Sequence, residues 1–189
     1  MKNLLILSFL AVIQSYSHMV ISQSLQFYRE DIVFKINNDV VLTDAVYHFC
    51  NVGEKDIHTQ LFYPFPDSTM ELIDTIIIND MKSKEIIPYR EGHSGVYFGI
   101  TVNAYGQASY RVFFRQRLEE QKYKYILTST ESWGRALEFA NFELQILENL
   151  KIDSISYPPD TSFMKDNIRY YFWNKKDFMP AKDFEVIFN

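Results

Sequence analysis

Cysteine is nearly missing from this chain, since Cys50 is the only one among 189 residues. No intramolecular disulfide can form, so stability has to come from packing even in an oxidising compartment. Glycine and proline are also sparse, at six residues each, whereas 47% of the residues are apolar. This composition excludes a disordered chain and predicts one domain, or two small ones packed closely together.

Clusters of positive charge are missing as well. The formal net charge is −5, and the 19 lysines and arginines are spread along the chain. Binding to nucleic acid needs clustered lysine and arginine to displace phosphate counterions, so we expect no nucleic-acid partner. The sequence also lacks a glycine-rich phosphate-binding loop, a His-Glu-x-x-His zinc-binding helix, a Gly-x-Ser-x-Gly nucleophile elbow and paired cysteine ligands. The sequence therefore predicts no cofactor, no metal and no catalytic residue by motif.

One long hydrophobic run is present, at the N-terminus. Residues 4–13 are apolar apart from one serine, they follow a positively charged start, and Ser17 suits a signal peptidase. The alternative is a membrane anchor, but a span needs about 20 predominantly apolar residues, and Gln14 interrupts the run early. We expect a signal peptide over residues 1–22, cleaved near 17 or 22. The mature protein would be periplasmic or extracellular, without stable membrane insertion.

The remaining residues, 23–189, are dominated by a period of two. Residues 40–51, for example, alternate between a face with Tyr47 and Phe49 and a face with His48, which is typical of a strand with two distinct faces. Similar short segments recur about every 8 to 12 residues, separated by turn residues. This pattern predicts an all-β fold, an antiparallel β-sandwich.

Turn residues suggest how these strands pair. The stretch after residue 51 contains glycine and charged residues, which predicts a hairpin between 40–51 and 57–63. A turn rich in small and polar residues also separates 96–103 from 108–117, which predicts a second hairpin.

The segment 136–147 is ambiguous. Ala136, Phe139 and Leu147 fit a helical stripe, but the central residues also alternate in the manner of a strand. We favour a strand because the neighbouring segments are strands. A break near 131–136 leaves open a division of the mature chain into two closely packed sub-units.

The first predicted hairpin raises a question about Cys50. If Asn51 lies opposite Ile57, Cys50 falls opposite His58. Cys50 is then either an ordinary small buried side chain or half of a Cys–His pair that activates a thiolate. A metal site made by His48 and His58 lacks a third ligand.

Aromatic residues crowd the C-terminal third of the chain. Tyr171 and Trp173 alternate with two further aromatic residues, so both faces of that strand are aromatic. Phe113 is expected on the solvent side of its strand, among arginines, and Trp133 lies in the break described above. These four residues are either core or, where exposed, a candidate binding surface.

Several short motifs resemble a known group of proteins. The runs AVYHFCN at 45–51 and FYPFP at 62–66, and later YILTST at 125–130 followed by Trp133, resemble segments of exported bacterial β-sandwich proteins of unknown function. More distantly they resemble the vault and inter-alpha-trypsin (VIT) type domain. The resemblance implies an immunoglobulin-like or VIT-like sandwich and a role in binding or assembly. It carries no active site.

Two hypotheses about function follow. The first is an exported, non-catalytic module that docks on another protein or a cell-envelope polymer through an edge strand or an aromatic face. The second is a small secreted hydrolase or carbohydrate-active enzyme, which would need two carboxylates such as Asp44, Glu131 or Glu138 to converge in a cleft. The pattern favours the first.

Overall fold

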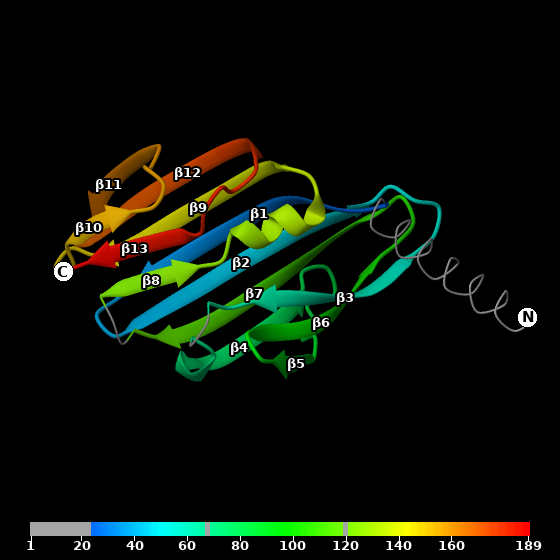
Figure 1. The fold of residues 1–189 in the computed structure, drawn as a ribbon, viewed down its shortest axis with the longest axis horizontal. Helices are drawn as coiled ribbons and strands as arrows, with labels where there is room; N and C mark the ends of the chain where they lie inside the picture. Colours follow the sequence, from blue (N-terminus) through cyan, green and yellow to red (C-terminus); the bar gives the residue numbers. More distant parts are fainter. Residues whose placement is uncertain (1–23, 67–68, 119–120) are drawn as a thin grey trace, which may run out of the picture.

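A large curved sheet forms one layer of the molecule (Figure 1). The computed structural model describes residues 24–66, 69–118 and 121–189, so the predicted signal peptide lies outside the described residues. The large sheet has seven strands. Their order across the sheet is β11 (Thr161–Lys165), β12 (Ile168–Phe178), β9 (Leu137–Leu147), β1 (Leu25–Ile36), β2 (Val40–Asn51), β7 (Gln107–Arg117) and β4 (Ile73–Asp80).

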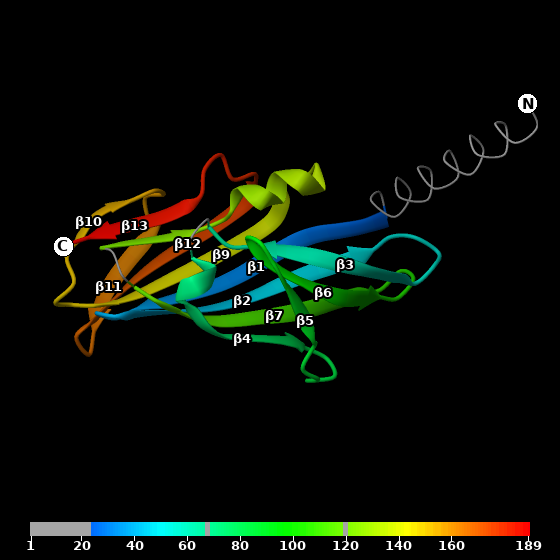
Figure 2. The same cartoon turned by 60° about the horizontal axis from the view of Figure 1, so that its bottom comes forward.

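Two small three-stranded sheets form the second layer (Figure 2). One has the order β10 (Ile152–Ile155), β13 (Phe184–Phe188) and β8 (Lys122–Tyr125), and the other has the order β3 (Ile57–Pro64), β6 (Gly95–Val102) and β5 (Tyr89–Gly92). Two short 3-10 helices, η1 (Met70–Leu72) and η2 (Thr128–Trp133), complete the described elements. The prediction of an all-β, sandwich-like fold is confirmed.

Both small sheets pack on the same face of the large sheet, which we call the inner face. On β1, the Phe34 ring stacks on Phe184 of β13, with ring centroids 4.7 Å apart. On β7, Phe114 lies 6.2 Å from Tyr63 of β3. Burial of these large aromatic side chains between the layers replaces the disulfides that the chain lacks.

The alternation predicted for β2 is confirmed. Every second residue from Val41 to Asn51 is buried, and the residues between them are half-buried on the opposite, outer face. The ambiguous segment is also a strand, β9, in which Ala140, Phe142 and Leu144 face the inner layer. A helix over the same residues would have left one edge of β1 without a backbone hydrogen-bond partner.

One pairing departs from the antiparallel prediction. β1 and β9 run parallel, with Ile32 beside Phe142, while the other pairs among the described strands are antiparallel. Parallel neighbours need a long connection. Here that connection includes β2, β4 and β7 of the large sheet and strands of both small sheets.

The two predicted hairpins are wrong in the same way. β2 does not pair with β3, and β6 does not pair with β7, because each intervening loop carries the chain from one layer to the other.

The Asn51 side chain holds the two crossing loops together. Its side-chain amide donates to the backbone oxygens of Lys55, Val102 and Asn103 at 2.7 to 3.1 Å, and its oxygen accepts from the Gly53 N–H.

The predicted break near 131–136 coincides with a short helix. β8 ends at Tyr125, η2 follows over Thr128–Trp133, and Gly134 caps its C-terminus in the left-handed conformation (φ 65°). η2 lies over the inner face, near the N-terminal half of β1 (Figures 1 and 2). Within the described residues, no helix is long and apolar enough to cross a membrane.

Candidate functional site

A cavity lies between the inner face of the large sheet, β3 and β6 of one small sheet, and η2 with the segment before it. Its volume is about 70 Å³, whereas one water molecule needs only about 10–15 Å³. The exposed side chains of Phe62 and Ser129 reach its rim, and buried Glu30 lies in its wall. The lining residues are Phe27, Glu30, Tyr47, Phe49, Leu61, Phe62, Tyr63, Pro64, Phe98, Tyr125, Ile126, Ser129, Thr130 and Trp133.

Glu30 is the one carboxyl group among these lining residues. The side chain is only 3% exposed, and in the described part of the chain its Oε1 atom has no hydrogen-bond partner. Burial away from water, together with a smaller effect of the nearby charge of Asp31, raises the pKa of Glu30 to about 8. A carboxyl group in this state is costly to keep, which makes Glu30 the candidate functional group of the cavity.

A β-bulge in β1 places Glu30 on the inner face. The pairing with β2 shifts between Phe27 and Arg29, so that Tyr28 is an extra residue. Because of this extra residue, Phe27 and Glu30 both face inward although they are three positions apart. Bulges often redirect side chains beside functional sites, and here the bulge lies next to the cavity.

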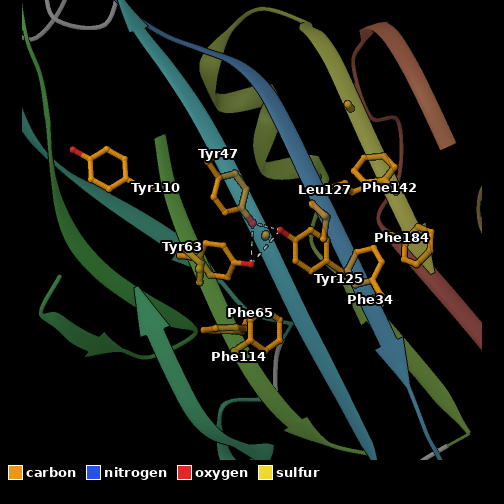
Figure 3. Packing of buried hydrophobic residues seen from close by; sticks show 14 of the residues in the cluster. Phe34, Tyr47, Tyr63, Phe65, Tyr110, Phe114, Tyr125, Leu127, Phe142 and Phe184 are labelled. Carbon is orange, nitrogen blue, oxygen red and sulfur yellow. Dashed lines mark hydrogen bonds between the residues drawn. The ribbon is translucent and has the colours of Figure 1, made fainter. Parts of the chain in front are cut away.

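Three tyrosine hydroxyls meet in the cavity wall (Figure 3). Tyr47 donates to Tyr63 at 3.0 Å, Tyr63 donates to Tyr125 at 3.1 Å, and the hydroxyls of Tyr47 and Tyr125 are also in contact. The three residues come from β2, β3 and β8, so the cluster joins the large sheet to both small sheets. Burial raises the pKa of each hydroxyl, so all three remain neutral at physiological pH.

Three further aromatic rings, one of them from η2 itself, line the part of the cavity next to η2. Phe27 lies 5.4 Å from Phe49 and 5.7 Å from Trp133, and Phe49 lies 5.6 Å from Trp133, measured between ring centroids. The cavity thus combines aromatic walls with one carboxyl group and a small set of hydroxyls. This combination of an apolar lining and a few polar groups is typical of ligand-binding pockets.

A second polar feature crosses the outer face of the large sheet. His48 Nε2 lies 2.8 Å from Asp31, and His48 Nδ1 lies 2.8 Å from Ser109 Oγ. Asp31 also accepts hydrogen bonds from Arg29 and Asn141. Burial would raise the pKa of Asp31, but these donors hold it below its ordinary value.

Serine, histidine and aspartate in this order perform nucleophilic catalysis in hydrolases, where donors aimed at an oxyanion also surround the serine. Here the three side chains lie along the outer face of a sheet, on β7, β2 and β1. Asp31 is shared with two further donors. We therefore interpret the chain of hydrogen bonds as a link that holds four neighbouring strands in register.

The structure separates the four aromatic residues of the predicted binding surface. Trp133 lies in the cavity wall. Trp173 is fully buried and donates to the Tyr157 carbonyl at 3.0 Å, so it is a core residue. Tyr171 is half-buried beside it on the inner face, and Phe113 is half-buried on the outer face.

The Cys50–His58 pair is wrong, because β2 and β3 lie in different sheets. Cys50 lies between Gln26 and Gln107 on the neighbouring strands, and His58 contacts Thr101 at 2.9 Å. Burial raises the pKa of the Cys50 thiol, which is the opposite of thiolate activation. Among the described residues, no three histidine, cysteine or acidic side chains are grouped to hold a metal ion, and His48 instead contacts Asp31.

The carboxylates of the hydrolase hypothesis do not converge. Asp44 pairs with Arg111 at 2.6 and 2.8 Å on the outer face. Glu138 pairs with Arg135 at 3.2 Å, and Glu131 is exposed on η2. None of the three lines the cavity.

The sequence analysis missed Glu30, although a signal was present. Ile32, Phe34 and Ile36 alternate as an inward face, and Glu30 is in phase with them. An acidic residue in phase with three large apolar residues predicts a buried carboxyl group.

Comparison with known proteins shows a likeness of architecture. No protein-family model and no curated protein matches the sequence. A solved structure from Legionella pneumophila, provisionally assigned as a nutrient-binding protein, superposes with a TM-score of 0.70 and 12% identity, over 87% of this chain and 67% of that chain.

An M1 zinc metallopeptidase from Deinococcus radiodurans superposes with a TM-score of 0.51 and 8% identity, over 87% of this chain. The match spans only 42% of the peptidase. The likeness is one of fold.

Proposed function

We propose that this chain is an exported, non-catalytic β-sandwich module that binds its partner by accepting a small group of that partner into the inter-sheet cavity. The partner is another protein or a cell-envelope polymer. The proposal depends on one observation, the carboxyl group of Glu30 that lies almost fully buried in the cavity wall without a partner for Oε1 among the described residues. Folding alone gives no reason to keep such a group.

Other features support binding over catalysis. The cavity wall carries one carboxyl group, whereas hydrolysis of glycosidic bonds needs two in most enzymes of that class. A likeness in fold to a protein provisionally assigned to nutrient binding agrees with a binding role. The N-terminal run and the resemblance to exported bacterial sandwich proteins support export.

Blocking the cavity rim tests the proposal. Ser129 is exposed at the rim on η2, so Ser129→Trp places a large ring across the opening. Ser132→Trp places the same ring on the same helix, at an exposed position outside the lining, and is the matched control. The mature protein and both variants are immobilised and exposed to envelope extract from the native cells.

We expect the unmodified protein and Ser132→Trp to retain the same component, and Ser129→Trp to retain about tenfold less of it, because a steric block removes the buried contacts that dominate binding. Equal retention by all three proteins would place the binding surface elsewhere and overturn the proposal. Near-ultraviolet circular dichroism of the variants checks that both fold.

A further inference from the structure

The tyrosine hydroxyls that face the cavity have no hydrogen-bond donor to spare. Each tyrosine hydroxyl has one hydrogen to donate. In the cluster, Tyr47 donates to Tyr63 and Tyr63 donates to Tyr125, which leaves Tyr125 to donate to Tyr47 and close the ring. All three hydrogens are then used, while each oxygen keeps a lone pair to accept a further bond.

The carboxyl group of Glu30 adds to this excess of acceptors. Glu30 lies opposite Tyr47 on the neighbouring strand, and its charge acts on all three tyrosines. When ionised, a carboxylate only accepts hydrogen bonds. A ligand that satisfies this wall must therefore bring several donors, and a positive charge to balance the buried carboxylate.

The aromatic rings favour an organic cation over a metal ion. Phe27, Phe49 and Trp133 line the same space and lie within 5.4 to 5.7 Å of one another, measured between ring centroids. Aromatic rings attract ammonium groups. Calcium takes six to eight oxygen ligands, whereas this wall has one carboxyl group among its lining residues. The volume of about 70 Å³ suits a group of a few non-hydrogen atoms.

We propose that the cavity is a binding site for a primary ammonium group, R–NH3⁺, with Glu30 as its counter-ion, the tyrosine hydroxyls as acceptors and the aromatic rings as its walls. A primary ammonium has three N–H donors, whereas a quaternary ammonium has none. This inference rests on the proposed binding function and names the chemical class of the group that enters the cavity. On a protein or polymer partner, that group is an amine.

Binding should release a proton below pH 8. The free site holds Glu30 protonated until about pH 8, and an ammonium binds the ionised form, so binding and deprotonation are linked. The tyrosines of the cluster face Glu30 and stay neutral, and the ionised Asp31, next to Glu30 in β1 but on the outer face, acts on it through its charge. Apparent affinity should therefore fall by about tenfold for each pH unit below about 8.

Titration of the mature protein with methylammonium chloride tests the inference. The readout is the ¹³C signal of the Glu30 carboxyl carbon, assigned by its loss in Glu30→Gln, with amide signals of residues around the cavity as a second readout. We expect saturable shifts with methylammonium, and affinity that is about tenfold or more weaker in Glu30→Gln, since hydrogen bonds to charged groups are the stronger ones. Glu143→Gln, on the outer face of β9, is the matched control and should bind normally.

Three further probes separate the ligand class from the binding function. Sodium chloride at equal ionic strength should leave the cavity signals unchanged, and tetramethylammonium and neutral acetamide should bind about tenfold more weakly than methylammonium. If acetamide binds as well as methylammonium, and Glu30→Gln binds both equally, the ammonium assignment is wrong while the cavity remains a binding site. If none of the probes shifts a cavity signal, the ammonium assignment is overturned, and only the rim variants then decide the binding function.

Discussion

At the scale of single residues, the burial of Glu30 makes the stability of the fold depend on pH. In the unfolded chain its carboxyl group loses a proton at the ordinary pKa of a glutamate, whereas in the folded protein it keeps that proton up to about pH 8. The folded state therefore binds more protons across this range, and the free energy of unfolding falls as pH rises.

This difference in proton binding predicts how the stability of the protein depends on pH. Between the ordinary pKa of a glutamate and about pH 8, Glu30 should lower the free energy of unfolding by about 1.4 kcal/mol for each pH unit. Glu30→Gln removes this contribution, so the variant should be more stable than the original protein at pH 8 and nearly equal to it at pH 4. Urea unfolding followed by circular dichroism at these two pH values measures the difference.

The control for this experiment is again Glu143→Gln, whose carboxylate accepts from Gln145 on the outer face. It should leave the slope with pH unchanged. A slope that persists in Glu30→Gln would assign the pH dependence to other groups and remove the main argument that Glu30 is buried as an acid.

At the scale of elements, Asn51 shows what holds the two layers in register. Its amide serves three backbone oxygens on the two crossing loops. In Asn51→Asp, carboxylate oxygens would face these carbonyls in a buried position. We expect a loss of about 3 kcal/mol in the free energy of unfolding, because the carbonyls lose their donors and a charge is buried among acceptors.

Asn149→Asp provides the comparison, since Asn149 is exposed and bonds only to the Asn38 side chain among the described residues. That change should cost less than about 0.5 kcal/mol. Equal effects of the two substitutions in urea unfolding would mean that Asn51 does not hold the crossing loops.

The strands themselves could be predicted from the sequence, but their partners could not. Alternation revealed β2 and decided for β9 as a strand, because burial on one face leaves a period of two in the residue types. The same alternation does not indicate which strands pair with each other. The loop that follows Asn51 has the composition of a hairpin turn, yet it crosses to the other layer, held by side-chain bonds to residues about fifty positions away.

The location of the candidate site could not be predicted from the sequence for the same reason. Trp133 was named as a candidate binding residue because it is aromatic, but the sequence did not indicate where it lies in the fold. Glu30 is in phase with the inward residues of β1, but the sequence does not show that β3 and η2 close over it to form a cavity. The motifs quoted for the resemblance, by contrast, mark packing and loop positions such as Asn51.

At the scale of the whole molecule, the N-terminal apolar run leads to a prediction about export. We expect the full chain, expressed in a bacterial host, to appear in the exported fraction with a new N-terminus at His18 or Gln23, because the apolar run suits signal peptidase and is too short for a stable span. N-terminal sequencing and intact mass after cell fractionation measure this. A cytosolic product that retains Met1 would contradict export.

The position of β1 in the middle of the large sheet has a consequence for the order of folding. β1 emerges first during synthesis, but its parallel neighbour β9 follows much later, with Asp31 and Asn141 separated by 110 residues. Contacts across such a separation form slowly, and an unpaired strand edge invites association with other chains. Until β9 has been synthesised, one edge of β1 therefore has no partner strand, and during that interval the incomplete chain is open to association with other chains.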